Sequence, residues 1–298
     1  MINIIVTGAS GMIGSKLLRL LPNDFRLVKN IDRTEGLDIL NYPGLLTTLS
    51  SARADVIVHM AAFTDVNAAA RQEGKSEGLC FQINVTGTRN IVKLAKQLNC
   101  QLIHISTDYV FDGTKTGEYL ETDKPNPIEW YGKTKYEAEK IVLGSDIKWC
   151  IVRTAYPFLA EFPGKFDLVR SRIKQMKDGN LPPQFTDHII TPTSADQLSI
   201  GLFKLIRAKA LGIYHLVGDT SLSDFDITTE IAKQFGFDET EITKSSLAEF
   251  NKSAPRPYQQ QMAMSNQKFK SQFGNTFSSF PEALAAIKIQ MKEVEKLI

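Results

Sequence analysis

The feature that most constrains the fold of this chain is a glycine-spaced turn close to its N-terminus. Residues 2–6 form an apolar run typical of a buried strand, and residues 7–14 read Thr-Gly-Ala-Ser-Gly-Met-Ile-Gly. Apolar residues then recur at helical spacing, at Ile13, Leu17, Leu20 and Leu21. A strand that turns tightly into a helix directs unpaired backbone N–H groups and the positive end of the helix dipole at one point. The pattern therefore predicts a phosphate-binding turn, because glycine lets a phosphate approach the backbone closely.

The rest of the first half alternates short apolar strands with helical patterns. Strands are expected at residues 25–31, 55–59, 102–106 and 149–153, and a helix at residues 84–98. Short apolar strands separated by helices indicate a parallel sheet covered on both faces. Right-handed crossovers then favour an α/β fold with a Rossmann-like, doubly wound sheet.

Past residue 155 the alternation stops. We expect residues 1–155 to form the nucleotide-binding domain, with a later strand near residues 212–217 returning to its sheet. Residues 156–298 are expected to form mainly a smaller, discontinuous substrate-binding lobe. In a doubly wound fold, ligands bind at the carboxyl ends of the strands. Five residues stand at such ends and are expected to converge: Asp32, Ala61, Ala62, Ser106 and Thr107.

Composition narrows the classes of partner. The 298 residues carry a net charge of +2 without a lysine or arginine cluster, which argues against nucleic acid and anionic membranes as partners. No apolar run is long enough to cross a membrane, and the first strand begins too early for a signal peptide. The three cysteines lack paired spacing and the four histidines lack ligand spacing. We therefore expect a cytoplasmic protein with reduced thiols and no metal.

One further pattern points to acid–base chemistry. Tyr131 and Lys135 lie four residues apart at the start of an expected helix, and so on the same helix face. An ammonium group near the phenol is expected to lower the tyrosine pKa from its reference of about 10, which would suit proton transfer. Thr107 can donate a hydrogen bond to a substrate oxygen. Tyr136 and Lys140 share the same spacing, but Tyr136 points about 140° away from Tyr131; Tyr131 is preferred because it follows a proline-containing loop directly.

Taken together, these motifs resemble an extended short-chain dehydrogenase/reductase, and within it the dTDP-4-dehydrorhamnose reductase family. The resemblance spans nearly the whole chain. It rests on residues 7–14, 60–64 (Met-Ala-Ala-Phe-Thr), 106–113 (Ser-Thr-Asp-Tyr-Val-Phe-Asp-Gly), 131–135 (Tyr-Gly-Lys-Thr-Lys), 153–156, 191–193, 212–216 and 256–257. The chain departs from the family at Tyr156, where tryptophan is usual, and at Met12, where glutamine is frequent. Residues 159–190, expected to form much of the sugar pocket, match poorly.

The resemblance implies hydride transfer from NADH or NADPH to a keto carbon of a nucleotide-linked deoxy sugar. Tyr131 would protonate the carbonyl oxygen, Lys135 would hold a nicotinamide-ribose hydroxyl, and Thr107 would polarise the carbonyl. The cofactor-binding residues implied are Gly8, Ser10, Gly11, Met12, Ile13, Asp32, Arg33, Asp38, Ile39, Ala61, Ala62, Thr64, Ser106, Tyr131, Lys135 and Tyr156. The substrate-binding residues implied are Thr64, Asp108, Tyr109 and Tyr156.

Cofactor choice stays open at the sequence level. Asp32 follows the second strand, where a carboxylate accepts a hydrogen bond from the ribose 2′-hydroxyl and disfavours a 2′-phosphate. The adjacent Arg33 can instead pair with that phosphate. We therefore expect acceptance of both NAD and NADP.

Two alternative functions share these motifs. A sugar-nucleotide epimerase or dehydratase would have the same fold and the same Tyr131 and Lys135, but dehydratases usually have an acidic pair after the threonine, and here Asp108 is followed by Tyr109. The regulatory subunit of methionine adenosyltransferase resembles the same family and would be a cofactor-binding protein without catalysis. Similar proteins are often homodimers, so a homodimer is compatible with the resemblance, although the chain shows no interface pattern.

Overall fold

The computed structural model describes residues 1–295, and the side chains of residues 1–292. The chain divides into two compact units. The first unit comprises Met1–Asp112, Lys124–Arg153 and Ser199–Tyr214, and the second comprises Gly113–Asp123, Thr154–Leu198 and the chain from His215 onward. We expected a boundary near residue 155 and a return of residues 212–217 to the first domain. The segment that returns to the first unit is residues 199–214, and residues 113–123 lie in the second unit.

A six-stranded sheet organises the first unit. Its order is β10-β5-β4-β3-β1-β2, and the pairs β1–β2, β1–β3 and β3–β4 are parallel. The strands are β1 (Ile2–Thr7), β2 (Phe25–Ile31), β3 (Val56–His59), β4 (Gln101–Thr107), β5 (Trp149–Thr154) and β10 (Gly212–His215). The predicted Rossmann-like α/β fold and all of its predicted strands are confirmed. The strand order reverses direction at β1 and β3, where such sheets bind their ligands.

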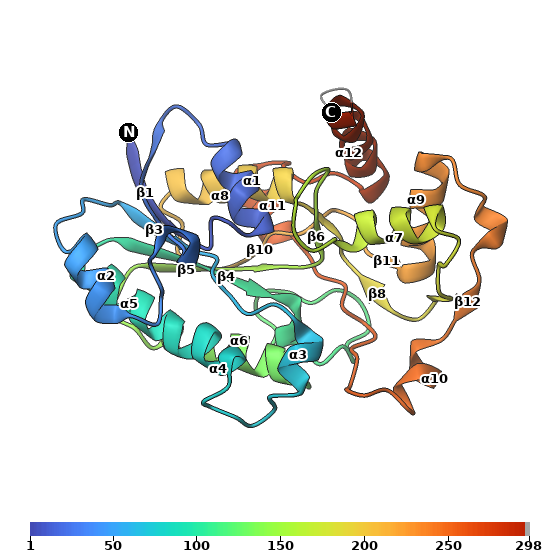
Figure 1. The fold of residues 1–298 in the computed structure, drawn as a ribbon, viewed down its shortest axis with the longest axis horizontal. Coiled ribbons are helices and arrows are strands. Elements are labelled where there is room, and N and C mark those ends of the chain that lie inside the picture. Colours follow the sequence, from blue (N-terminus) through green and yellow to red (C-terminus); the bar gives the residue numbers. More distant parts are fainter. Residues whose placement is uncertain (296–298) are drawn as a thin grey trace. The chain divides into compact units, whose positions relative to one another are not determined.

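Helices cover both faces of this sheet (Figure 1). Helices α1 (Met12–Arg19) and α8 (Ala195–Arg207) lie on one side, and α2 (Tyr42–Leu49), α5 (Thr88–Gln97) and α6 (Trp130–Leu143) lie on the other. The fully buried strand residues Ile5, Ile57 and Leu102 pack against this second set. Short pieces complete the unit: α3 (Val66–Ala70), α4 (Leu79–Phe81), η1 (Arg33–Glu35), η2 (Gln82–Gly87) and η3 (Asp108–Val110).

The helix expected at residues 84–98 begins differently from the prediction. The short helix α4 directly precedes a π-helical turn over residues 82–87, and regular α-helix resumes at Thr88. Gly87 lies so close to the core that a Cβ there would be 2.4 Å from Cδ1 of Ile39. Wide turns of this kind often mark functional positions in helices.

The second unit is built from short strand pairs and helices. β6 (Pro157–Phe158) pairs with β9 (Thr193–Ser194), β7 (Gln184–Phe185) with β12 (Lys244–Ser245), and β8 (Ile189–Ile190) with β11 (Leu222–Ser223). Its helices are α7 (Leu168–Lys177), α9 (Asp224–Phe235), α10 (Leu247–Asn251), α11 (Gln267–Phe273) and α12 (Phe280–Glu295), with the short turn η4 (Glu239–Glu241). Ser223 caps α9, because its Oγ accepts a hydrogen bond from the backbone N–H of Asp226 at 3.0 Å.

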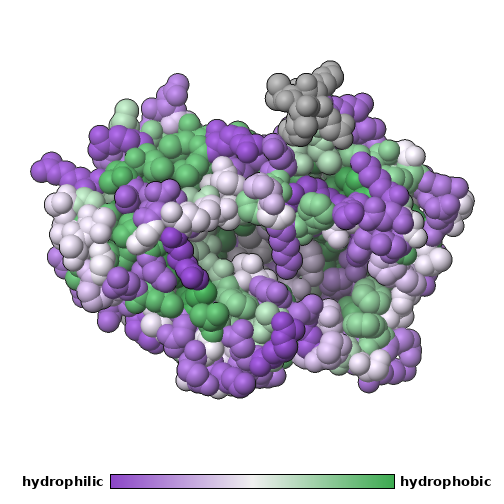
Figure 2. Space-filling model, viewed as in Figure 1, coloured by the Kyte–Doolittle hydropathy of each residue, from purple (hydrophilic) through white to green (hydrophobic). Residues whose placement is uncertain are grey.

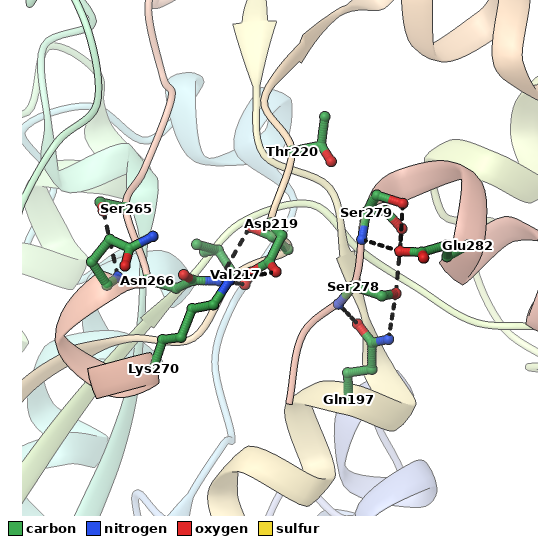
Figure 3. Close-up of polar contacts among 12 residues, drawn as sticks. Gln197, Val217, Asp219, Thr220, Ser265, Asn266, Lys270, Ser278, Ser279 and Glu282 are labelled. Carbon is green, nitrogen blue, oxygen red and sulfur yellow. Dashed lines mark hydrogen bonds and ion pairs between the residues drawn. The ribbon is translucent and has the colours of Figure 1, made fainter. Parts of the chain in front are cut away.

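Polar side chains tie the late segments of the second unit together (Figure 3). The amide of Asn266, just before α11, donates to the backbone oxygen of Val217 at 2.9 Å and to Asp219 at 2.6 Å. Gln197 donates to the hydroxyl of Ser278 at 2.7 Å, just ahead of α12. The contacts of Asn266 fix the chain before α11 to the segment that leaves β10, and the contact of Gln197 fixes the chain after α11 to the start of α8.

The visible surface mixes hydrophilic and hydrophobic residues (Figure 2). Among the residues with described side chains, the exposed large hydrophobic residues come from separate segments, for example Met1, Leu79, Leu211 and Ile289. Within residues 1–295, none of the helices combines the length and the apolar character that crossing a membrane requires.

Candidate functional site

The glycine turn is imposed by close backbone contacts. Gly8 has φ of +70°, and a Cβ on it would lie 2.7 Å from the backbone nitrogen of Ala61. A Cβ on Gly14 would lie 2.3 Å from the carbonyl oxygen of Gly8. Gly11 stands at the N-cap of α1 and has no side chain to cap the first N–H groups of the helix. This arrangement fits the pyrophosphate of a dinucleotide, since a substituent on any of these glycines would disturb the turn or obstruct the anion.

Thr7 connects the two strands at the point where the sheet order reverses. Its hydroxyl accepts hydrogen bonds from the backbone N–H groups of Met60 at 3.1 Å and Ala61 at 3.0 Å. The same oxygen lies 2.7 Å from Nδ1 of the buried His59. The glycine turn and the Met60–Ala62 segment after β3, both implied by the resemblance, are therefore brought together in the first unit.

Asp32 has a structural role that the sequence analysis did not foresee. Its Oδ2 accepts from the backbone N–H of Ser10 at 3.0 Å and from the Ser10 hydroxyl at 2.6 Å, and its Oδ1 accepts from Thr34. Burial alone would raise the pKa of this carboxyl, but the hydrogen bonds from Ser10 and Thr34 hold it below its ordinary value. Asp32 thus ties the glycine turn to the end of β2 with both of its oxygens.

The predicted cofactor-binding residues that follow Asp32 differ in exposure. The side chain of Arg33 is 78% exposed, and its Nε lies 4.0 Å from a carboxylate oxygen of Asp38. Ile39, by contrast, is buried in the core beside α5. Arg33 is therefore the cation that the end of β2 presents to solvent.

The first turn of α6 carries Tyr131 in a tightly fixed position. Glu129, which is buried, caps the helix by accepting hydrogen bonds from the backbone N–H groups of Tyr131, at 2.8 Å, and Gly132. A Cβ on Gly132 would lie 2.1 Å from the carbonyl oxygen of Tyr109. Neither Glu129 nor Gly132 was among the predicted site residues, although an acidic residue ahead of a helix is a recognisable cap signal.

Thr107, Asp108, Tyr109 and Tyr131 are brought together at the end of β4. The Thr107 hydroxyl donates to Asp108 at 2.8 Å, and it lies near enough to Tyr131 to lower the pKa of the phenol. The rings of Tyr109 and Tyr131 meet edge to face, with their centroids 5.6 Å apart. The structure therefore places the predicted acid and the predicted polarising hydroxyl beside each other.

Lys135 is buried one helical turn beyond Tyr131. Its Nζ donates to the carbonyl oxygen of Ile105 at 2.7 Å, and burial lowers the pKa of this ammonium to about 8. The pKa of Tyr131 is raised above its ordinary value, because burial and the nearby carboxylates of Asp108 and Glu129 penalise the phenolate more than the Thr107 hydrogen bond stabilises it. The expectation that Lys135 lowers the pKa of Tyr131 is therefore wrong in this structure. The phenol is held in its protonated form.

A buried polar network behind Tyr131 was also missed. Thr134 donates to the carbonyl oxygen of Tyr131 at 2.8 Å and accepts from the amide of Asn84 at 3.0 Å. Asn84, in the π-helical turn, accepts from the backbone N–H of Phe63 at 2.8 Å and donates to its carbonyl oxygen. This network links α6 to the segment after β3, where the exposed Thr64 follows Phe63. Asn84, placed between the apolar Ile83 and Val85 in a helical stretch, was the signal that could have identified it.

Ser106 is a predicted cofactor-binding residue with an unusual environment. Ser106, at the end of β4, is 3% exposed, and within the described part of the chain its hydroxyl has no hydrogen-bond partner. A buried hydroxyl without a partner fits a position where a ligand supplies the missing hydrogen bond.

Tyr136, the alternative tyrosine, is only half-buried, and Nζ of Lys140 lies 5.2 Å from the centre of its ring. Among residues with described side chains, no three His, Cys, Asp or Glu groups cluster as a metal site.

Comparison with known proteins identifies the family. Residues 2–292 match the family described as RmlD substrate binding domain. The chain belongs to this family. The dTDP-4-dehydrorhamnose reductase of Aggregatibacter actinomycetemcomitans is 32% identical over 238 residues, which cover 78% of each chain.

Solved structures agree with this assignment to the RmlD family. A dTDP-4-dehydrorhamnose reductase from Clostridium acetobutylicum superposes with a TM-score of 0.87 at 27% identity, covering 98% of this chain and 100% of that one. The dTDP-4-dehydrorhamnose reductase of Bacillus anthracis, solved in complex with NADP, gives a TM-score of 0.86 at 28% identity, with 97% and 100% covered. The predicted resemblance is confirmed.

Tyr156 is the predicted site residue that comes from outside the first unit. It belongs to the second unit and adopts φ of +41°. Its expected contact with the sugar or the nicotinamide stays a prediction, as do the individual ligand contacts expected of the residues in the first unit.

Proposed function

We propose that this protein reduces the keto carbon of a nucleotide-linked deoxy sugar with NADPH or NADH, as a dTDP-4-dehydrorhamnose reductase does. The observation that carries the proposal is the buried Tyr131 beside Thr107 at the end of β4, with the buried Lys135 on the same helix face. The names of the related proteins support the same reaction class.

In this reaction the bound nicotinamide supplies a hydride to the keto carbon. Tyr131 donates a hydrogen bond to the carbonyl oxygen, and Thr107 donates a second one when its hydroxyl turns from Asp108 to that oxygen. Negative charge grows on the oxygen as the carbon is reduced. Tyr131 then transfers its proton to the oxygen. A raised phenol pKa suits this donor role, because the proton stays on the phenol until the stronger base, an alkoxide, forms.

Lys135 contributes a positive charge next to these groups. Its ammonium donates to the backbone of β4 and has further N–H groups with which to bind a ribose hydroxyl of the cofactor. The glycine turn, with Ser10, Met12 and Ile13, would bind the pyrophosphate, while Ala61, Ala62 and Ser106 would border the cofactor at the strand ends.

Cofactor choice in this proposal depends on Arg33. Both oxygens of Asp32 are engaged by Ser10 and Thr34, while Arg33 is exposed beside them. An exposed guanidinium can pair with a 2′-phosphate. We infer that NADPH is accepted together with NADH, with Asp38 and Ile39 on the adenine side of the site.

The sugar is expected to contact Thr64, Asp108, Tyr109 and Tyr156. We propose a keto-deoxysugar linked to dTDP as the first substrate to test, from the names of the relatives. The buried thiols of Cys80, Cys100 and Cys150 fit a reducing compartment and support a cytoplasmic location. A homodimer stays a prediction from the resemblance.

The test is turnover by the purified full chain. A panel of keto-sugar nucleotides is offered with NADPH or NADH, and loss of the reduced nicotinamide absorbance is recorded. Oxidation of the cofactor only when a keto sugar is present supports the proposal. Cofactor binding without turnover of any sugar, together with copurification of a synthetase, would instead favour the regulatory alternative.

A further inference from the structure

A series of buried hydrogen bonds starts at the end of β1, directly before the glycine turn. The hydroxyl of Thr7 accepts from the backbone N–H groups of Met60 at 3.1 Å and Ala61 at 3.0 Å. These two bonds occupy both lone pairs of the oxygen, so its single proton is donated to Nδ1 of His59, 2.7 Å away. Since Nδ1 accepts, the proton of the neutral imidazole is on Nε2.

His59 is kept neutral by its surroundings. It is 1% exposed, and burial together with the positive charge of Lys135 lowers its pKa to about 3. The neighbouring His104, whose ring centre lies 5.3 Å from that of His59, has its pKa lowered by the same two causes. The directions of the hydrogen bonds around His59 are therefore the same at every pH at which the protein is folded and active.

The other side of the His59 ring continues the series toward α6. Nε2 carries the proton and lies 3.0 Å from the hydroxyl of Thr88, which donates in turn to the carbonyl oxygen of Asn84 at 2.6 Å. The side-chain amide of Asn84 donates to Thr134 at 3.0 Å, and the Thr134 hydroxyl donates to the carbonyl oxygen of Tyr131 at 2.8 Å. Each hydroxyl in this Thr7–Tyr131 series thus has one defined direction of donation.

The ends of the Thr7–Tyr131 series are the two parts of the proposed site that must be aligned. Thr7 precedes Gly8, and a Cβ on Gly8 would lie 2.7 Å from the backbone nitrogen of Ala61, so the glycine turn and the segment after β3 are in close backbone contact. The opposite end is the backbone of the proposed proton donor. All members of the series belong to the first unit. His59 joins its two halves, because it accepts from one half and donates to the other.

We propose that His59 is a positioning residue that fixes the distance between the cofactor-binding turn and Tyr131, by accepting from Thr7 and donating to Thr88. Its role is geometric: a neutral ring whose proton is engaged by Thr88 holds two segments in register and transfers no proton. The inference rests on the proposed function, since it takes Tyr131 as the proton donor beside a bound nicotinamide cofactor.

Two leucine variants test this role by kinetics. His104 is the matched control, because it is as buried as His59 but neither ring nitrogen has a hydrogen-bond partner among the residues with described side chains. In His59→Leu the single-turnover rate of cofactor oxidation should fall roughly 100-fold, the cost of a displacement of about 1 Å, with the Kd for NADPH within about threefold of wild type. In His104→Leu both quantities should stay within about threefold. Equal losses in the two variants would assign the effect to core packing and overturn the proposal.

A conservative variant and a double variant sharpen the test. His59→Gln has an amide with one acceptor and one donor, so its rate should recover to within about tenfold of wild type. Thr134→Val breaks the same series closer to Tyr131, and the double variant His59→Leu with Thr134→Val should be no slower than the slower single variant. A glutamine variant as slow as His59→Leu, or losses that multiply in the double variant, would contradict the proposed series.

NMR of the protein without substrate separates this inference from the proposed function. We expect His59 of the wild type to carry a slowly exchanging proton on Nε2, and the backbone amide signal of Tyr131 to shift more in His59→Leu than in His104→Leu. A proton on Nδ1 overturns the inference without any variant having to fold, and so does a Tyr131 signal that His59→Leu leaves in place. If these signals behave as expected but wild type reduces no keto sugar, the proposed function fails and the positioning of Tyr131 by His59 stands.

Discussion

The two tyrosines of interest, Tyr131 in the first unit and Tyr156 in the second, are held in opposite ways. Tyr131 sits in the first turn of a regular helix with a buried cap, and its partner Thr107 ends a regular strand. Tyr156 lies in an irregular segment with a left-handed backbone, and its partners come from two other segments. The chemical step requires a fixed protonation state and a rigid scaffold, which helices and strand ends provide. Recognition can be built on connecting segments, which tolerate sequence change more readily.

The largest effect is expected from removing the proton donor of the first unit. Tyr131→Phe should lower kcat by roughly 100- to 10,000-fold, the range for loss of a general acid, with cofactor affinity retained. Single-turnover cofactor oxidation and fluorescence titration of NADPH measure the two quantities. Tyr136→Phe, on the same helix, is the matched control and should resemble wild type. Unchanged turnover in Tyr131→Phe would show that Tyr131 is not the proton donor.

A second test displaces α6, the helix that carries Tyr131, and leaves the phenol itself unchanged. In Gly132→Ala the new Cβ would lie 2.1 Å from a backbone oxygen of Tyr109, so α6 must shift. A displacement of about 1 Å can cost on the order of 100-fold in rate, and the melting temperature should fall as well. In Gly144→Ala, at the other end of α6, the nearest atom to the Cβ would be 3.3 Å away, and we expect nearly normal stability and kcat. Equal behaviour of the two variants would show that the first turn of α6 is not rigid.

The pH dependence of the reduction rate tests whether the charge of Lys135 is needed. Burial lowers the pKa of Lys135 to about 8, so its positive charge is present below that pH and lost above it. The rate of reduction should therefore fall by about tenfold per pH unit above this value, while Tyr131, whose pKa is raised, stays protonated. Lys135→Arg keeps its charge throughout, so its smaller kcat should lack this alkaline limb. Persistence of the limb in Lys135→Arg would assign it to another group.

The smallest effect is expected at the exposed edge of the cofactor site. Arg33→Ala should lower kcat/KM with NADPH by about tenfold, because one charge-assisted contact with the 2′-phosphate is lost. With NADH, which lacks that phosphate, kcat/KM should fall by less than about twofold. Asp32→Ala should impair use of both cofactors, because Asp32 holds Ser10 of the glycine turn. Steady-state kinetics with each cofactor measures both. An equal loss with NADH and NADPH in Arg33→Ala would mean that Arg33 does not meet a 2′-phosphate.

Several parts of the site were predictable because local patterns encode them. The spacing of Gly8, Gly11 and Gly14 and the pair Tyr131 and Lys135 follow from strand, turn and helix geometry over a few residues. The link from Asn84 through Thr134 to Tyr131 spans 50 residues, and no local pattern reports such a contact. The role of Asp32 was only partly foreseen, because the hydrogen bonds from Ser10 form only when β2 ends beside the glycine turn.

The sequence by itself determined the order of strands and helices, the glycine turn and the family, since these depend on periodicity and on residue types at short spacing. Only the tertiary structure decided the protonation of Tyr131 and Lys135, because burial sets the cost of both charges and the carboxylates of Asp108 and Glu129 add to the cost of the phenolate. It also decided the meeting of Thr7, His59 and Thr88, since the free energy of a hydrogen bond depends on distances that the order of residues does not contain.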